Sequence, residues 1–243
     1  MAAEVVCGVV LGVQPYGERG IVVQLYTREY GRMGVISYAG KAKDGSNATS
    51  FFRVLSILSV SVREGRHAGN MRQLVGVEGW KRGTQAALDV PRMAVACFIG
   101  ELLQSLLTEP TQNEEIYEFL EGRIELLYAR VIDEIPFLMV FVLDLSKVLG
   151  YEPAGLSTAT TPHFNLGSGE FCSQYDANAI DSIAREDATV WSRLLTERYR
   201  VDLRSVHSAQ RYRVLQQELR YLEIHSGVQL KLKSFSVLRE LVG

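Results

Sequence analysis

Two lysines stand close together in a short segment that otherwise carries only small and polar side chains. The segment, residues 39–46, reads AGKAKDGS, and Lys41 and Lys43 are its only cations. Lysine ammonium groups neutralise nucleic-acid phosphates. An aromatic ring such as that of Tyr38, which directly precedes the segment, can stack on a base. These residue types at this spacing therefore indicate nucleic-acid binding.

Further cations and aromatic residues occur within the first 80 residues. In a five-stranded barrel of the OB type, nucleic acid lies across the second and third strands, between the first and last hairpin loops. The candidate DNA-binding residues in such segments are Lys41, Lys43, Arg19, Arg32, Arg28, Arg66 and Tyr38, with Tyr26, Arg63 and His67 beside them. The alternative is that the cations are ordinary surface charges and that the tyrosines belong to the core.

The residues that would form a catalytic or metal site are scattered. The four histidines show no HExxH pattern and have no carboxylates at metal-ligand spacing. The chain also has no GxSxG motif and no Walker loop, and its GSGEF segment, residues 167–171, follows no strand-to-helix pattern. We therefore expect no catalytic residue, no metal site and no cofactor. An unrecognised site in the segment STATTPHFNLGSGEF, residues 157–171, is the remaining enzymatic alternative.

The formal net charge of −2 hides a segregation of charge along the chain. Residues 1–82 carry a net charge of +5, residues 83–192 carry −12, and residues 193–243 carry +5. Surfaces of opposite charge indicate different partners. The basic ends favour a DNA-binding protein. The alternative is a protein-only adaptor that docks partners through its barrel and its acidic helical surface.

Cysteine usage and hydropathy favour a cytoplasmic protein with no membrane anchor. The three cysteines are odd in number and widely spaced, which argues against disulfides and structural zinc. The apolar run at residues 5–13 follows Glu4 and no cation, so it indicates a strand and not a signal peptide. The most apolar stretch, residues 135–150, contains Asp144 and Lys147 and is too short to span a bilayer. We expect it to form a buried core helix.

Alternating apolar residues and turn signals predict five strands in the first 80 residues. They are expected at residues 4–13, 20–28, 33–40, 51–63 and 71–79. Five strands without a long helix between them are typical of a small closed barrel, either OB-like or SH3-like.

Helical periodicity begins after residue 80. Asp89 and Asn113 are suitable N-caps for helices over residues 89–109 and 113–131, and Val131 is expected on the apolar stripe of the second. Further helices are predicted at 135–149, 176–199 and 208–226, the last ending at Gly227. The sequence thus predicts an α+β multidomain protein, with an OB domain at 1–80 and an α-helical domain at 81–243. An irregular insert at about 151–175 should contain a small hairpin around FNLGSGEF.

Several weak motifs, taken in order, resemble the RecO family of bacterial recombination mediators. The first is YGERGIVVQLYTREYGRMGVIS, residues 16–37, followed by the small-residue basic loop YAGKAKDGS. The second is LRYLEIHSGVQLKLKSFSVLREL, residues 219–241, which is similar to the closing helix and Lys-Ser-x-x-Val-Leu ending of the family. The resemblance covers nearly the whole chain.

The resemblance implies a protein without enzymatic activity that binds single- and double-stranded DNA and anneals complementary strands. With its partner RecR, it would help load the RecA recombinase onto DNA coated by single-strand-binding protein. By position in the motifs, Lys41 and Lys43 would be DNA contacts, with Arg19 and Arg32 as further candidates.

The chain departs from the family pattern at two places. Many members bind zinc through four cysteines in the insert, whereas this insert keeps only Cys172. Members also dock the acidic, Phe-ending tail of single-strand-binding protein on the helical domain, yet the middle of this chain is acidic. The few cations available for such a contact are Arg123, Arg130 and Lys147.

Overall fold

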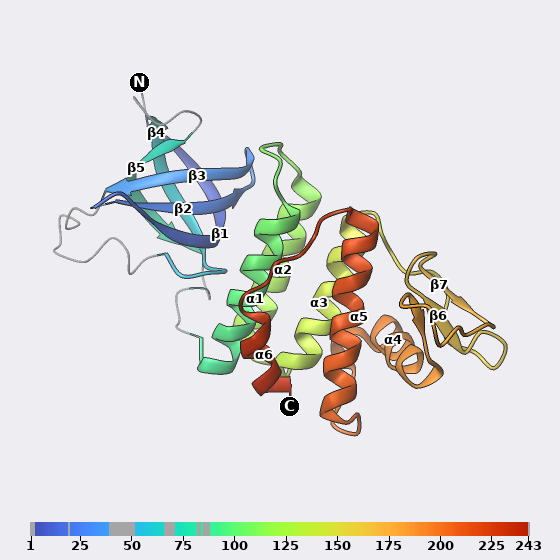
Figure 1. Cartoon of the computed structure of the whole chain (residues 1–243). Coiled ribbons are helices and arrows are strands. Elements are labelled where there is room, and N and C mark those ends of the chain that lie inside the picture. Colours follow the sequence, from blue (N-terminus) through green and yellow to red (C-terminus); the bar gives the residue numbers. More distant parts are fainter. Residues whose placement is uncertain are drawn as a thin grey trace. The chain divides into compact units, whose positions relative to one another are not determined.

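Five strands near the N-terminus close into a barrel (Figure 1). They are β1 (Glu4–Tyr16), β2 (Gly20–Thr27), β3 (Gly31–Tyr38), β4 (Ile57–Glu64) and β5 (Arg72–Trp80). The computed structural model describes residues 3–18, 20–38, 52–65, 71–81, 84 and 88–242, with side chains up to residue 238. The strand order is β1-β2-β3-β5-β4, with β4 pairing back onto β1 and a parallel pair between β3 and β5. The predicted OB-like barrel is therefore confirmed.

The barrel core follows from the alternation of side chains along each strand. Leu58, Val60 and Val62 of β4 all point inward, as their spacing predicts. The fourth strand begins at Ile57, so the prediction that it starts at residue 51 was wrong. The chain turns at residues 54–55, where Leu55 has a φ of 61°. Phe52, which precedes this turn, is buried in the barrel core.

Two helices belong to the same compact unit as the barrel, α1 (Val90–Leu106) and α2 (Glu114–Ala129). Both predicted caps are confirmed: the Asp89 side chain accepts from the Arg92 amide at 3.1 Å and the Asn113 side chain from the Ile116 amide at 3.0 Å. Val131 lies beyond the end of α2 and is 71% exposed, so its assignment to the apolar stripe was wrong.

Helix α1 lies directly on β1 because Gly100 has no side chain. A Cβ at Gly100 would lie 2.7 Å from the carbonyl oxygen of Leu11. The Gln104 amide donates to the same oxygen at 3.0 Å. The first compact unit accordingly spans Met1–Ala129 and the second Arg130–Gly243. The boundary between these two units differs from the expected domain boundary at residues 80–81. That residues 1–80 fold independently stays a prediction.

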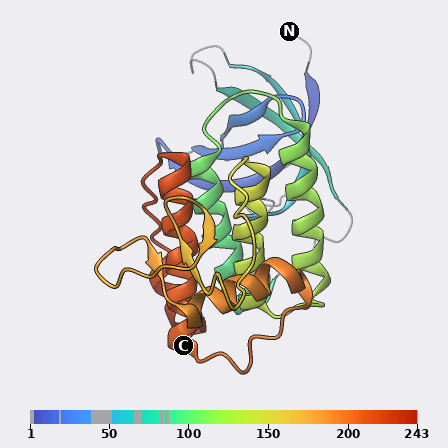
Figure 2. The ribbon, with the colours of Figure 1, turned by 90° about the vertical axis from the view of Figure 1, so that its right-hand side faces the viewer.

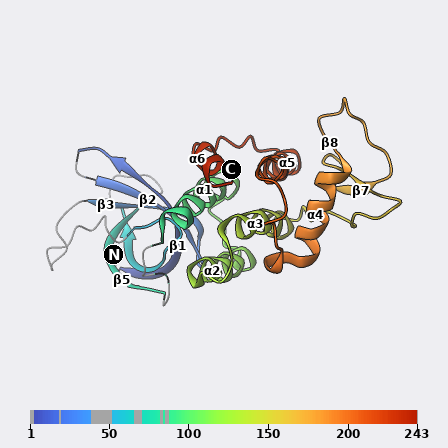
Figure 3. The ribbon, with the colours of Figure 1, turned by 90° about the horizontal axis from the view of Figure 1, so that it is seen from below.

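The second unit is built around α3 (Glu134–Val148), which is buried on nearly all sides, as its composition predicts. It packs against α4 (Arg185–Glu197) and α5 (Ser208–Ser226), and these three helices lie side by side in Figure 3. Gly227 ends α5 with a φ of 70°. A short 3-10 turn, Arg198–Arg200, follows α4, and a further helix, α6 (Phe235–Val242), was not predicted. No helix in the described part of the chain has both the length and the apolar character needed to cross a bilayer.

The insert contains the predicted hairpin, formed by β6 (His163–Asn165) and β7 (Glu170–Cys172). A third strand, β8 (Ser182–Ile183), pairs with β6. Phe164 is fully buried and stacks on Trp191 of α4, with ring centroids 4.7 Å apart. This contact holds the small sheet against α4, and Figure 2 shows the ribbon of the sheet next to that helix.

Candidate nucleic-acid interface

Two exposed tyrosines flank a glycine at one end of the barrel. Gly20, the first residue of β2, pairs with Tyr16 of β1 on one side and with Tyr38 of β3 on the other. A Cβ at Gly20 would lie 3.5 Å from Cδ1 of each tyrosine ring. The missing side chain at Gly20 therefore leaves room for both rings over the same residue. We call Tyr16, Gly20 and Tyr38 the tyrosine rim.

The rings of the tyrosine rim are accessible to a ligand. The exposed fractions are 40% for Tyr16 and 57% for Tyr38, whereas Tyr26 of the neighbouring face is only 3% exposed. Burial raises the pKa of the Tyr26 hydroxyl. The alternative that the tyrosines belong to the core therefore holds for Tyr26, whereas Tyr38 lies on the surface. Sequence reasoning missed Tyr16, although its place at the start of the first hairpin loop was a usable signal.

Four of the predicted DNA-binding residues, Arg19, Lys41, Lys43 and Arg66, lie outside the described residues, as does His67. Along the chain, Arg19 directly precedes Gly20, and Lys41 follows Tyr38 by three residues. Three of the cations are thus neighbours in sequence of the tyrosine rim.

Arg63 lies at the exposed end of β4, three residues before Arg66 in the sequence. Its Nε and Nη2 atoms donate to the side-chain oxygen of Gln73 at 3.1 and 2.9 Å. Because Gln73 is neutral, this contact does not compensate the positive charge of the guanidinium.

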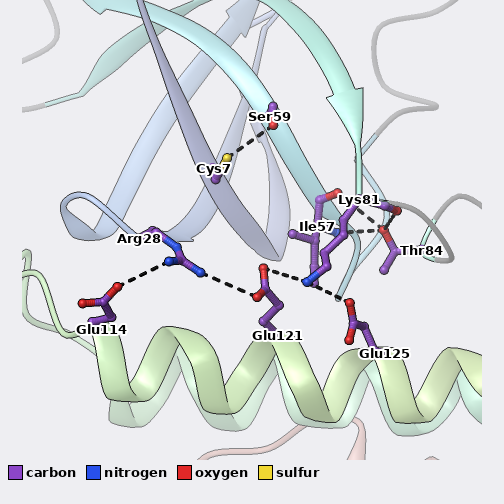
Figure 4. A network of polar contacts seen from close by, with 9 residues as sticks. All are labelled: Cys7, Arg28, Ile57, Ser59, Lys81, Thr84, Glu114, Glu121 and Glu125. Carbon is purple, nitrogen blue, oxygen red and sulfur yellow. Dashed lines mark hydrogen bonds and ion pairs between the residues drawn. The ribbon is translucent and has the colours of Figure 1, made fainter.

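Arg28, by contrast, is engaged by α2. Its guanidinium lies 3.3 Å from a carboxylate oxygen of Glu114 and 3.6 Å from one of Glu121, and 4.8 Å from the ring centroid of Tyr117. Lys81, at the end of β5, pairs with Glu121 at 3.0 Å and with Glu125 at 2.7 Å (Figure 4). Lys81 was not among the candidate residues from the sequence. Its acidic partners lie 40 or more residues further along the chain, so no local pattern points to it.

Arg32 has a structural role at the C-terminal end of α1. Its guanidinium donates to the carbonyl oxygens of Gln104 and Leu107, the latter at 3.2 Å. These oxygens have no partner within the helix, and a cation at this end also suits the helix dipole. Partial burial lowers the pKa of Arg32. Because its Nη1 atom is hydrogen-bonded to the end of α1, we do not include Arg32 among the proposed DNA-binding residues.

The three cations predicted to bind a partner peptide have different surroundings. Arg123 lies on α2 in the first unit, with its guanidinium 5.6 Å from the ring centroid of Phe119. Arg130, in the second unit, is exposed and has a φ of 58°. Lys147 on α3 pairs with Glu152 at 2.8 Å. The basic tail shows similar pairing, because Arg213 of α5 donates twice to the buried carboxylate of Asp187, at 2.6 and 2.7 Å.

The insert hairpin sets Cys172 opposite His163 in register, and His163 stacks on Tyr175 with ring centroids 5.1 Å apart. Among the described residues, no group of three possible ligands is close enough to hold a metal ion.

The fold defines a class: an α+β protein in which an OB-like barrel precedes a helical region with a small sheet. The chain matches the family model described as "Recombination protein O N terminal" over residues 1–80. It matches "Recombination protein O C terminal" over residues 87–234. The chain therefore belongs to the RecO family of DNA repair proteins.

Curated relatives agree with this assignment along the whole chain. A protein named DNA repair protein RecO from Christiangramia forsetii is 27% identical, with 97% of each chain covered. Proteins of the same name from Flavobacterium psychrophilum and Bacteroides fragilis are 24% and 23% identical. The alignments cover 96% of this chain in both cases, and 96% and 97% of the relatives.

Proposed function

We propose that this protein binds single- and double-stranded DNA through the tyrosine rim and the cations that adjoin it in sequence, and that it anneals complementary strands. With RecR, it helps load the RecA recombinase onto DNA coated by single-strand-binding protein. It acts in the cytoplasm by binding alone, without catalysing a reaction. The RecR and RecA partners rest on family membership.

The observation that carries the proposal is the tyrosine rim. Single-strand binding in OB folds combines aromatic rings that stack on bases with cations that follow the phosphates. The rim supplies two exposed rings from β1 and β3, the two strands that flank β2, and Arg19, Lys41 and Lys43 are its sequence neighbours. Arg63, at the end of β4, and Arg66, three residues further along the chain, add positive charge. The exposed aromatic rings therefore come from one end of the β1-β2-β3 segment, and the cations come from the neighbouring stretches of sequence.

The acidic tail of single-strand-binding protein is a further proposed partner, with Arg123, Arg130 and Lys147 as predicted contacts. Lys147 would have to exchange Glu152 for the peptide, because the two side chains are paired at 2.8 Å.

Binding of a labelled single-stranded oligonucleotide, followed by fluorescence anisotropy at several salt concentrations, tests the DNA-binding proposal. Lys41→Ala/Lys43→Ala should weaken binding and make the salt slope shallower by about 1.4, at about 0.7 per phosphate contact. Tyr16→Ala/Tyr38→Ala should weaken binding by roughly tenfold or more but leave the slope unchanged, because stacking is worth about 1–3 kcal/mol per base.

Two controls match these variants. Lys231→Ala/Lys233→Ala removes two positive charges at the same spacing from the second unit, and Tyr175→Ala removes an exposed ring far along the chain. Equal losses in the variants and their controls would refute the assignment to the rim. An absence of binding even at low salt would favour the adaptor function instead.

A further inference from the structure

Three glutamates of helix α2 form ion pairs with two cations, Arg28 and Lys81. Glu121 bridges Arg28 and Lys81, Glu114 adds a second contact to Arg28, and Glu125 adds a second contact to Lys81 (Figure 4). The three glutamates are separated by seven and four residues, which is the helical spacing that keeps side chains on one face. Within the described ranges, both cations thus have two carboxylate partners each.

These ion pairs are too exposed to be the main attachment of α2. The side chains of Arg28 and Lys81 are 38% and 32% exposed, and those of Glu114 and Glu125 are 62% and 45% exposed. Exposed pairs of this kind contribute only about 0–1 kcal/mol each. Their clearer effect is electrostatic, since they neutralise two cations that would otherwise face solvent or a ligand.

A pocket of about 510 Å³ lies beside the same side chains, within the first unit. Its walls include the cations Arg28 and Lys81, the aromatic residues Trp80 and Tyr117, and the carboxylates of Glu78 and Glu121. Cations next to aromatic rings are also the combination that the tyrosine rim and its neighbours offer. The pocket therefore has both the space and the groups to hold part of a nucleic-acid strand, once the carboxylates are displaced.

We propose that Arg28 and Lys81 form a second phosphate-binding site and that Glu114, Glu121 and Glu125 of α2 occupy it in place of phosphates. This proposal rests on the proposed DNA-binding function. Because α2 holds these carboxylates beside both cations, DNA does not reach the site in the wild-type protein, and removal of the carboxylates opens it. The contact between α2 and the barrel is thus autoinhibitory and lowers the affinity for DNA.

Two charge-matched variants test the proposal in the salt-dependent anisotropy assay. Glu121→Gln/Glu125→Gln leaves Lys81 with no carboxylate partner, and Arg28 with one, in the part of the chain that the structure describes. Glu115→Gln/Glu118→Gln removes the same charge from exposed positions of the same helix that form no ion pair among the described residues. The first variant should bind single-stranded DNA several-fold more tightly than the second, with a salt slope steeper by about 0.7 for each freed cation.

The cations themselves supply the second arm. Arg28→Gln/Lys81→Gln in the wild-type background should leave the salt slope unchanged, because both charges are already neutralised. The same pair in the Glu121→Gln/Glu125→Gln background should abolish the gain in affinity. Circular dichroism and urea unfolding of each variant show whether the fold is retained.

The outcomes separate this inference from the function on which it rests. If the wild type binds DNA but the two glutamate variants bind equally, the carboxylates only fasten α2 and the inference is refuted. A loss of slope in Arg28→Gln/Lys81→Gln alone would also refute it, by showing that the cations are already in use. If neither the wild type nor any variant binds DNA, the proposed function and the inference both fail.

Discussion

At the scale of single residues, chemically similar side chains have opposite roles in this protein. Arg28 and Arg32 are both cations next to the β2–β3 turn, yet one faces glutamates and the other caps a helix end. Tyr26 and Tyr38 differ in the same way, one in the core and one at the rim. The surroundings of a residue decide which of its possible functions is available.

Glu218 of α5 is a buried acid whose titration should be visible in stability. It is 0% exposed, and neither carboxylate oxygen has a hydrogen-bond partner among the described residues. Burial raises the pKa of Glu218 well above its usual 4.5. The folded state therefore keeps the proton while the unfolded chain releases it.

The sign of the pH effect follows from this difference in pKa. Wild-type stability should fall as the pH rises from about 4.5 through the folded-state pKa, by at most about 1.4 kcal/mol per pH unit. Glu218→Gln cannot titrate, so its stability relative to wild type, measured as the difference in the free energy of unfolding, should be higher at pH 7 than at pH 4.5. Urea denaturation at both pH values measures this, with Glu118→Gln as an exposed control. An identical difference at the two pH values would contradict the prediction.

At the scale of elements, the β2–β3 turn and the α1–α2 connection depend on each other. Gly31 has a φ of 64°, and a Cβ there would overlap the carbonyl oxygen of Thr111 and lie 2.8 Å from its carbonyl carbon. The Arg32 amide also donates to the carbonyl of Glu109 at 3.3 Å. The connection between the two helices therefore closes directly onto the turn.

Gly31→Ala should destabilise the first unit much more than Gly17→Ala. Gly17 has a similar φ of 58°, but a Cβ added there would meet no atom of the described residues within 4 Å, so this position isolates the backbone effect. We expect about 1–2 kcal/mol for Gly17→Ala and about 1–3 kcal/mol more for Gly31→Ala, because of the added clash. Urea unfolding of the two variants gives both values, and equal losses would show that the turn can move away from Thr111.

At the scale of the whole molecule, the barrel and helices α1 and α2 form one compact unit. Their sequences differ, because the barrel shows strand alternation and the helices show helical periodicity. The Leu11 side chain of β1 is 0% exposed, and its carbonyl oxygen accepts from Gln104 of α1 at 3.0 Å. Gly12 likewise has Gln104 as its nearest neighbour outside the strand. A barrel cut at residue 80 would lose these contacts.

A fragment of residues 1–129 should therefore unfold cooperatively in urea, whereas a fragment of residues 1–80 should not. Burying one Leu-sized side chain is worth about 1.5–3 kcal/mol, which is a large share of the stability of a small barrel. Circular dichroism of both fragments, compared with the whole chain, measures the difference. If the shorter fragment unfolds with the same midpoint as the longer one, the domain boundary lies at residues 80–81 as the sequence predicts.

The sequence by itself determined the features that depend on local patterns. Alternating apolar residues predict the five strands, Asp89 and Asn113 predict the helix starts, and Gly227 predicts the end of α5. Each of these follows from the conformational preferences of a few neighbouring residues. The RecO-like motifs could also be recognised from the sequence, because they stand in the same order along the chain as in the family.

Only the tertiary structure decided which candidate residues can meet a ligand. Arg28 and Glu121 are 93 positions apart in the chain, and Arg32 and Leu107 are 75 positions apart. No local pattern encodes such contacts, since they arise when strands and helices pack. The same reason applies to the tyrosine rim, because Tyr16 and Tyr38 become neighbours of Gly20 only through the strand register. Charge and residue type were readable in the sequence, whereas accessibility was a property of the fold.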